Sequence, residues 1–175
     1  PVVNRILAAA EAEGINVILG LSHDPDYWSL IETRVDVLDV YFRVRNTKNL
    51  RLQDALLENF GNVASWTGYY LTEEIDDLNW REPNRESVFH QFLMRSSRII
   101  RERDEERSIS ISAFFRKRTA PSIFAENLSD LMQATAIEQL WVQDGIGIEI
   151  LSTPLIEPYY SELDRVFADS PTNVG

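Results

Sequence analysis

Short apolar runs alternate with longer segments of helical periodicity along this chain. From Val2 to Glu13 the apolar residues recur at helical spacing, and the segment ends at Gly14, a residue suited to the left-handed stop of a helix. The segment Asn16–Leu21 follows, and it is short, continuous and apolar. Such a run is typical of a strand that is buried on both faces of a parallel sheet. The chain therefore begins with a predicted helix and a predicted buried strand.

The same alternation continues along the rest of the sequence. Similar apolar or aromatic runs predict three more strands, at 66–72, 109–115 and 139–143. Helical spacing predicts helices at 27–45, 50–60, 85–106, 121–136 and 159–167, with a polar break at 46–49. Repetition of strand and helix implies right-handed parallel crossovers. We therefore expect an α/β fold in which the four strands are neighbours in chain order in one parallel sheet.

Two architectures share this pattern, an open doubly wound sheet and a (β/α)₈ TIM barrel. A nucleotide-binding open sheet needs a glycine-rich turn between a strand and a helix. Gly145 and Gly147 do follow a predicted strand, but no third glycine follows them and Pro154 interrupts the next segment. The sequence therefore favours the barrel.

Composition and charge narrow the classes of protein to consider. The 175 residues, 44% of them hydrophobic, suit a single domain over residues 1–175. The net charge of −11 disfavours a nucleic-acid partner, because phosphate contacts need basic surfaces. The absence of cysteine excludes thiolate metal sites, disulfides and a cysteine nucleophile. No stretch approaches the roughly 18 apolar residues of a membrane helix, so we expect no membrane insertion.

Polar and aromatic side chains gather where the predicted strands end. In chain order these residues are His23, Asp24, Glu73, Glu74, Asp76, Asp77, Phe115, Arg116, Gln143 and Asp144. Because parallel strands share one carboxyl edge, we expect Glu74 and Asp144 to face one cleft together with His23 or Asp24. Glu73 should point away, since neighbours on a strand alternate. Structural roles remain open for several of these acids, as helix caps, turn residues or solvated side chains.

Carboxylates beside aromatic rings are what glycoside hydrolysis requires, and we treat Glu74 and Asp144 as the catalytic candidates. Rings such as Trp80 and Phe115 are more often core residues than sugar platforms, but Trp80 lies in the polar loop after the second strand, so we keep it as the main platform candidate, with Phe115 as a second. No serine stands in a G-x-S-x-G elbow, which argues against an α/β-hydrolase. A metal-dependent hydrolase that uses His23, Asp24 and Asp144 is an alternative, although a histidine beside a single acid is a weak metal signal.

Four segments also resemble the DUF4434 family. They are Ala9-x-x-x-x-Gly14-Ile-x-Val-x-Leu-Gly-Leu21, Trp66-x-Gly-Tyr-Tyr-Leu-Thr-x-Glu74-Ile-Asp-Asp77, Ser112-Ala-Phe-Phe115 and Val142-Gln-Asp-Gly-Ile-Gly147. The family consists of TIM-barrel proteins grouped with the glycoside hydrolases by likeness. The resemblance covers nearly the whole chain, and the Glu-Ile-Asp-Asp and Gln-Asp-Gly-x-Gly segments are its most specific parts.

The resemblance implies that Glu74 ends the fourth strand of a barrel, where related glycosidases place their general acid/base. It also implies that the nucleophile lies at the end of the seventh strand, while this chain supplies barrel strands three to six, the middle of a larger barrel. A periplasmic or secreted location is favoured by the family alone.

Our leading hypothesis is a glycosidase-like domain that acts on a poly- or oligosaccharide, with no cofactor. A non-catalytic carbohydrate-binding or assembly domain is the main alternative. The expected substrate-binding residues are His23, Asp24, Asp76, Asp77, Trp80, Phe115 and Gln143.

Overall fold

The structure is a computed structural model, and it describes residues 2–144 and 153–175. The helices are α1 (Val2–Glu13), α2 (Tyr27–Leu30), α3 (Val35–Phe60), α4 (Pro83–Arg103), α5 (Pro121–Ala134) and α6 (Glu157–Phe167), with a 3₁₀ turn, η2, at Thr153–Leu155. The strands are β1 (Val17–Gly20), β2 (Trp66–Asp76), β3 (Ser108–Phe114), β4 (Gln139–Gln143) and β5 (Asn173–Val174). Gly145 and Gly147 of the sequence motif lie outside the described residues.

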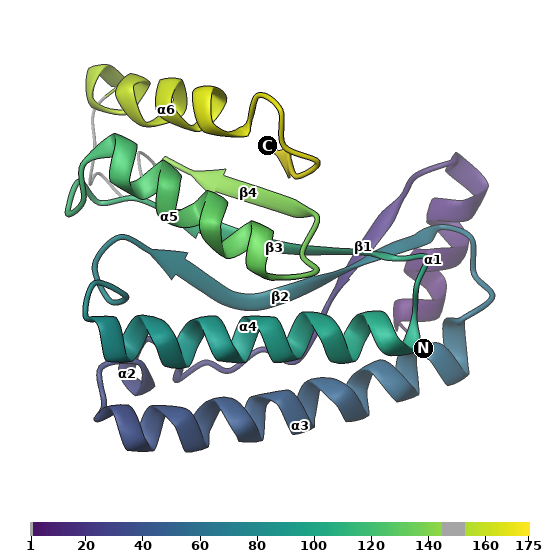
Figure 1. The fold of residues 1–175 in the computed structure, drawn as a ribbon. Helices are drawn as coiled ribbons and strands as arrows, with labels where there is room; N and C mark the ends of the chain where they lie inside the picture. Colours follow the sequence, from purple (N-terminus) through teal and green to yellow (C-terminus); the bar gives the residue numbers. More distant parts are fainter. Residues whose placement is uncertain (1, 145–152) are drawn as a thin grey trace.

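The strands form one parallel sheet in the order β1-β2-β3-β4-β5 (Figure 1). The predicted order and direction of the first four strands are therefore confirmed. Strand β5 was not predicted, because two residues give no periodic signal. A doubly wound sheet reverses its strand order at a switch point, whereas strands in unbroken chain order are those of a barrel.

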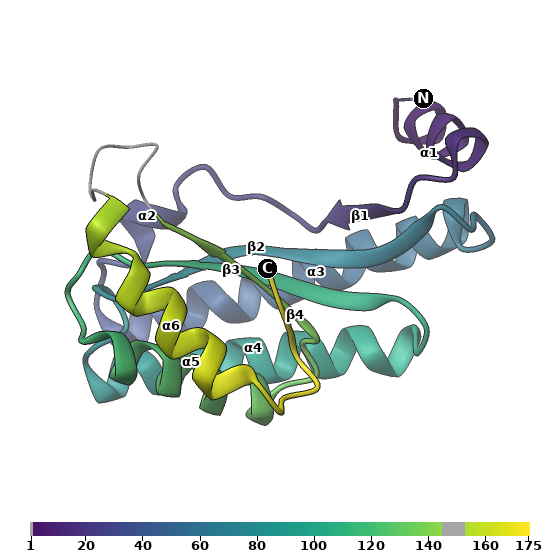
Figure 2. The same cartoon turned by 90° about the horizontal axis from the view of Figure 1, so that it is seen from above.

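Helices α3 to α6 lie together on one side of the sheet (Figures 1 and 2). The strand side chains that face them are fully buried, among them Tyr69, Leu71, Ile109, Ile111 and Leu140. These four helices leave the opposite face uncovered, and we call it the open face. No helix among the described residues is long and apolar enough to cross a membrane.

Helix α3 is continuous through residues 46–49, so the predicted break there is wrong. The chain breaks instead at residues 31–34, between α2 and α3. Two polar residues of the expected break are buried and accept hydrogen bonds: Asn46 accepts from Ser96 Oγ, and Asn49 Oδ1 accepts from the backbone N–H and hydroxyl of Ser22. These bonds offset the burial of polar groups, which periodicity alone cannot anticipate.

Gly68 and Gly20 lie on the open face, and they differ in how much space a Cβ atom would have. A Cβ on Gly68 would lie 2.6 Å from Ser108 Oγ and 3.0 Å from the Ser108 carbonyl oxygen. We therefore expect Gly68→Ala to lower the free energy of unfolding by about 1–3 kcal/mol, because the strands would have to separate. On Gly20 the nearest atom to a Cβ is Thr72 Cγ2 at 3.7 Å, so Gly20→Ala is the matched control. Urea unfolding measures both, and equal effects would contradict this reasoning.

Candidate functional site

A bulge near the end of β2 sets the direction of its two glutamates. Leu71 pairs with Ile111 and Ile75 with Ala113, so four residues of β2 span two residues of β3. Within the bulge Glu73 is 1% exposed, on the side of helix α3, whereas Glu74 is half-buried. Bulges re-aim side chains in this way. The opposite directions of the two glutamates agree with the alternation that the sequence predicted.

The Glu74 carboxylate lies on the open face and is held through one oxygen. Its Oε1 accepts hydrogen bonds from Gln143 Nε2 at 3.2 Å and from Ser112 Oγ at 3.3 Å. Ser112 Oγ also lies 2.6 Å from the Tyr70 hydroxyl. Among the described residues no group donates to Glu74 Oε2. The arrangement fixes the position of the carboxylate and leaves one oxygen for a ligand.

The Tyr70 hydroxyl also lies on this face, where it shares a hydrogen bond with Ser112 Oγ. Burial raises the pKa of its hydroxyl, and the charges of Glu74 and Glu73 raise that pKa further, while the Ser112 hydrogen bond lowers it. The hydroxyl therefore stays protonated at neutral pH. The sequence reasoning missed Tyr70 and Ser112. Tyr70 lies four residues before Glu74 on β2, and Ser112 lies on the neighbouring strand β3, so the alternation of side chains along each strand could have indicated both.

Aromatic rings flank this carboxylate. Trp141 pairs in register with Ser112, so it shares the open face, and it is 44% exposed. Trp28 on α2 is 37% exposed and meets Phe114 edge-on at 5.4 Å between ring centroids. Arg116 Cζ lies 4.8 Å from the centre of the Phe114 ring. Exposed rings beside polar side chains are the usual means of holding a sugar ring, and neither Trp141 nor Trp28 had been predicted as a platform.

The two rings that were predicted as platforms lie elsewhere. Phe115 is 0% exposed and stacks on Tyr159 at 4.1 Å, on the helical side of the sheet. Its neighbour Phe114 takes the open face because adjacent strand residues alternate. Trp80 is 7% exposed and stacks on Phe89 at 4.0 Å among the helices. Both rings therefore pack in the core in this structure, which corrects their expected position.

Asp76 and Asp77 organise the loops at the ends of β2 and β3, and both are buried. Asp76 accepts hydrogen bonds from the backbone of Leu78 and Asn79 and from the Asn79 side chain. The Asp77 carboxylate accepts from three backbone N–H groups of the loop after β3, those of residues 116, 118 and 119. These bonds give the two acids a structural role, and a role in binding substrate remains a prediction.

The other predicted residues occupy different surroundings. His23 is exposed, while Asp24 lies 4.0 Å from buried Arg45. Asp144 follows Gln143 directly, and its charge helps to raise the pKa of the Tyr160 hydroxyl on α6, after the larger effect of burial. Among the described residues no three or more histidine and acid side chains are grouped so that they could hold a metal ion. The metal-dependent alternative therefore lacks its ligand set there.

A buried ion pair connects the ends of the first two strands behind Glu74. Arg45 Nε donates to Glu73 Oε1 at 2.6 Å, and both side chains are 1% exposed. The same guanidinium donates to the Ser22 carbonyl, which Thr72 Oγ1 also contacts at 2.9 Å. In addition, the Tyr27 hydroxyl donates to the backbone carbonyl of Glu74 at 2.7 Å. These contacts fix the backbone that presents Glu74.

The parallel strands in chain order and the helices on one side of the sheet define a partial (β/α) barrel. The comparison that supports this class is with an intracellular xylanase of Thermoanaerobacterium saccharolyticum, solved with xylotriose. The superposition has a TM-score of 0.59 at 13% identity and covers 98% of this chain and 56% of the xylanase. At this identity the likeness concerns the fold.

The chain belongs to the DUF4434 family, which is described as a domain of unknown function. The match to this family covers residues 1–174. It is also 30% identical over 152 residues to the uncharacterized protein YbcH of Escherichia coli. That alignment covers 87% of this chain and 50% of YbcH, so the chain spans about half the length of its relative.

Proposed function

We propose that this domain acts on a polysaccharide as part of a glycoside hydrolase, with Glu74 as the general acid/base. The observation that carries the proposal is the Glu74 carboxylate itself. It lies near the end of the parallel strand β2, on the open face, and is oriented by Gln143 and Ser112 with one oxygen left for a ligand. A glycosidase acid needs this placement to protonate the oxygen of the leaving sugar.

Hydrolysis also requires a second carboxylate, which attacks the sugar or activates water. Asp144 remains a candidate from the sequence, and the family resemblance favours an acid at the end of the seventh barrel strand. Strand β5 (Asn173–Val174) runs parallel to β4. If β2 is the fourth barrel strand, as the resemblance implies, β5 is the seventh. We therefore propose a second catalytic carboxylate in the whole protein, and its position and the substrate linkage belong to that proposal.

A non-catalytic carbohydrate-binding domain is the second candidate. The exposed rings of Trp141 and Trp28 and the amide of Gln143 favour it, because rings and planar polar groups bind sugars without any proton transfer. Both candidates require that the open face binds a sugar. They differ in whether Glu74 carries out chemistry.

Truncation of Trp141 tests sugar binding by the open face. We expect Trp141→Ala to weaken binding about five- to thirtyfold, the effect of losing about 1–2 kcal/mol of contact energy. The measurement is affinity electrophoresis in gels that contain xylan or other soluble polysaccharides. Met94→Ala is the control, because Met94 is similarly exposed (46%) but lies on α4 on the helical side. Equal retardation of the Trp141→Ala, Met94→Ala and unchanged proteins would count against a sugar site here.

A further inference from the structure

The loop between β3 and α5, residues 115–120, holds the chain's only run of consecutive basic residues, Arg116-Lys117-Arg118. Everywhere else lysine and arginine stand singly, and the chain carries 28 acidic residues against 17 basic ones. The loop follows the carboxyl end of β3, so it lies at the same edge of the sheet as Glu74. We therefore ask what positive charge does at this edge of an acidic chain.

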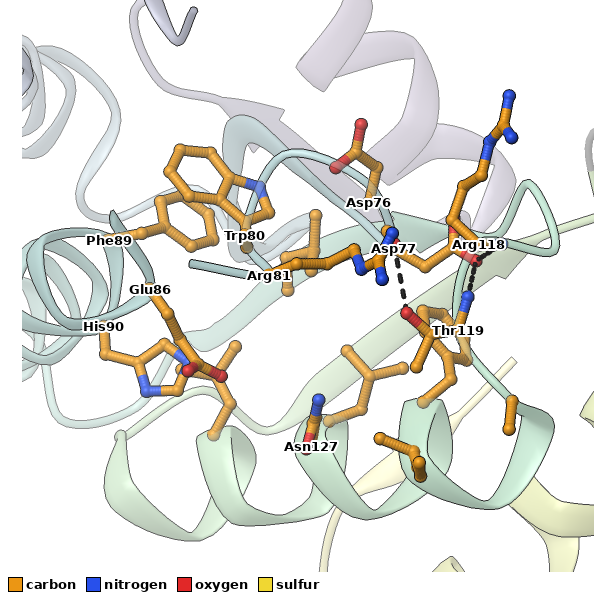
Figure 3. Close-up of a pocket in the computed structure, with 16 residues that line it drawn as sticks. Asp76, Asp77, Trp80, Arg81, Glu86, Phe89, His90, Arg118, Thr119 and Asn127 are labelled. Carbon is orange, nitrogen blue, oxygen red and sulfur yellow. Dashed lines mark hydrogen bonds and ion pairs between the residues drawn. The ribbon is translucent and has the colours of Figure 1, made fainter. Parts of the chain in front are cut away.

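Hydrogen bonds to a buried acid fix the backbone of this loop. The Asp77 carboxylate accepts from the N–H groups of Arg116 at 2.8 Å, Arg118 at 2.7 Å and Thr119 at 3.1 Å. Figure 3 shows the last two residues beside Asp77, at one wall of a pocket between α4 and α5. Lys117, in the middle of the run, has a φ of 60°, which few residues other than glycine adopt. Such a conformation persists where the surroundings enforce it, often at functional sites.

The Arg116 side chain lies on the open face, against aromatic rings. Its Cζ is 4.8 Å from the centre of the Phe114 ring and 6.0 Å from the centre of the Trp28 ring. The attraction between a cation and a ring face holds a guanidinium in such a position. Phe114 pairs in register with Gln143, whose amide donates to Glu74. Arg116 is therefore next to the residues that we propose bind the sugar.

The outer nitrogens of Arg116 are available to a ligand. Its Nε is buried without an acceptor, so a ligand does not reach that atom. The two Nη atoms also form no hydrogen bond or ion pair with a described residue, but they are not buried. A guanidinium presents paired N–H groups in the plane that a carboxylate accepts, and it stays charged at any physiological pH. The outer edge of this arginine therefore fits a carboxylate.

The acids at this edge do not neutralise Arg116 by contact. They are Glu74, Asp76, Asp77 and Asp144, and among the described residues none forms an ion pair with this arginine. Asp76 and Asp77 are buried and each accepts three hydrogen bonds. Against these four acids the loop sets three cations, so the charge at this edge is close to balance although the whole chain carries −11.

We propose that the open face takes an acidic polysaccharide, and that Arg116 binds the carboxylate of a uronic acid unit through its two Nη atoms. This inference rests on the proposed function, because it needs a sugar site on the open face, and it names the substrate class of that site. The carboxylate binds at Arg116 and not beside Glu74, because two carboxylates in contact repel each other.

Oligomers of galacturonate and of mannuronate are suitable probes, and their methyl esters, which keep the sugars but lose the charge, are the matched ligand controls. Binding is measured by titration calorimetry in about 0.15 M salt, where exposed charges more than about 8 Å apart are largely screened. The overall charge of −11 repels a polyanion, so tighter binding of an acid than of its ester requires a local cation. We expect at least one acid to bind about tenfold more tightly than its ester, the effect of one charge-assisted hydrogen bond.

Arg116→Gln should remove this preference and leave binding of the esters nearly unchanged. Arg95→Gln is the matched control, because Arg95 is an exposed arginine on α4, on the helical side, and likewise forms no ion pair with a described residue. It should keep the full preference for the acid. Circular dichroism and the urea midpoint show whether both variants are folded.

Two outcomes would overturn the proposal. One is an unchanged protein that binds both acids no more tightly than their esters. The other is a folded Arg116→Gln protein that keeps the preference for the acid. Either result leaves the proposal for Glu74 standing if neutral sugars still bind and their turnover depends on Glu74. If no sugar binds, acidic or neutral, the open-face site itself fails, and the inference about Arg116 fails with it.

Discussion

Replacing Glu74 with glutamine is expected to lower turnover of the polysaccharide substrate by about 10²–10⁴-fold, the usual contribution of a general acid. Glutamine keeps the shape of the side chain and its amide can still bond with Gln143 and Ser112, but it cannot transfer the proton. Sugar binding and the free energy of unfolding should therefore change little. Turnover is measured by release of reducing sugar, and binding by affinity electrophoresis, on the same substrate.

Glu58→Gln is the matched control, because Glu58 is an exposed glutamate near the far end of α3. It should leave turnover unchanged. Full activity in Glu74→Gln would remove Glu74 from the mechanism. If the unchanged protein binds a polysaccharide but hydrolyses none of a broad panel, the carbohydrate-binding candidate replaces the hydrolase.

Replacing Arg45 with methionine is expected to lower the free energy of unfolding by about 3–5 kcal/mol, because it leaves a buried carboxylate without its counter-ion. Arg45 and Glu73 are each 1% exposed and lie 2.6 Å apart, so water cannot take the place of the guanidinium. Urea unfolding at neutral pH measures the change. Replacing both partners, as Arg45→Met with Glu73→Leu, should recover much of the loss, since no charge then stays buried.

The exposed pair Arg43–Asp39 on the same helix is the matched control. Its arginine is 67% exposed, and Arg43→Met should change the free energy of unfolding by less than about 1 kcal/mol. Equal losses in Arg43→Met and Arg45→Met would show that burial of the Arg45–Glu73 pair has no energetic consequence.

The Arg45→Met effect should also depend on pH. Burial raises the pKa of Glu73, and Arg45 opposes that rise. Without Arg45 the folded-state pKa rises further above the unfolded value, so the folded state takes up a proton more readily. The loss of stability is then complete above the folded-state pKa and becomes smaller as the pH falls through it. A loss that grows toward acid pH would contradict this sign.

The sequence alone determined the strand positions and their order. The runs near 16–21, 66–72, 109–115 and 139–143 are apolar because strands under a helical layer must bury side chains, and no hairpin signal separates them. Alternation along a strand also separated Glu73 from Glu74 correctly. The same rule applied from Ser112 would have placed Phe114 rather than Phe115 on the open face.

Only the tertiary structure decided the roles of the polar residues. The segment 46–49 continues a helix, and Ser96 and Ser22, distant in sequence, donate hydrogen bonds to the side-chain oxygens of its buried residues Asn46 and Asn49. Arg45 meets Glu73 across 28 positions, and Asp77 binds a loop almost 40 residues away. Periodicity describes which side of an element is apolar, whereas the partner of a buried charge depends on packing between elements. For that reason the sequence located Glu74, and the structure was needed to find Ser112, Tyr70 and Trp141 beside it.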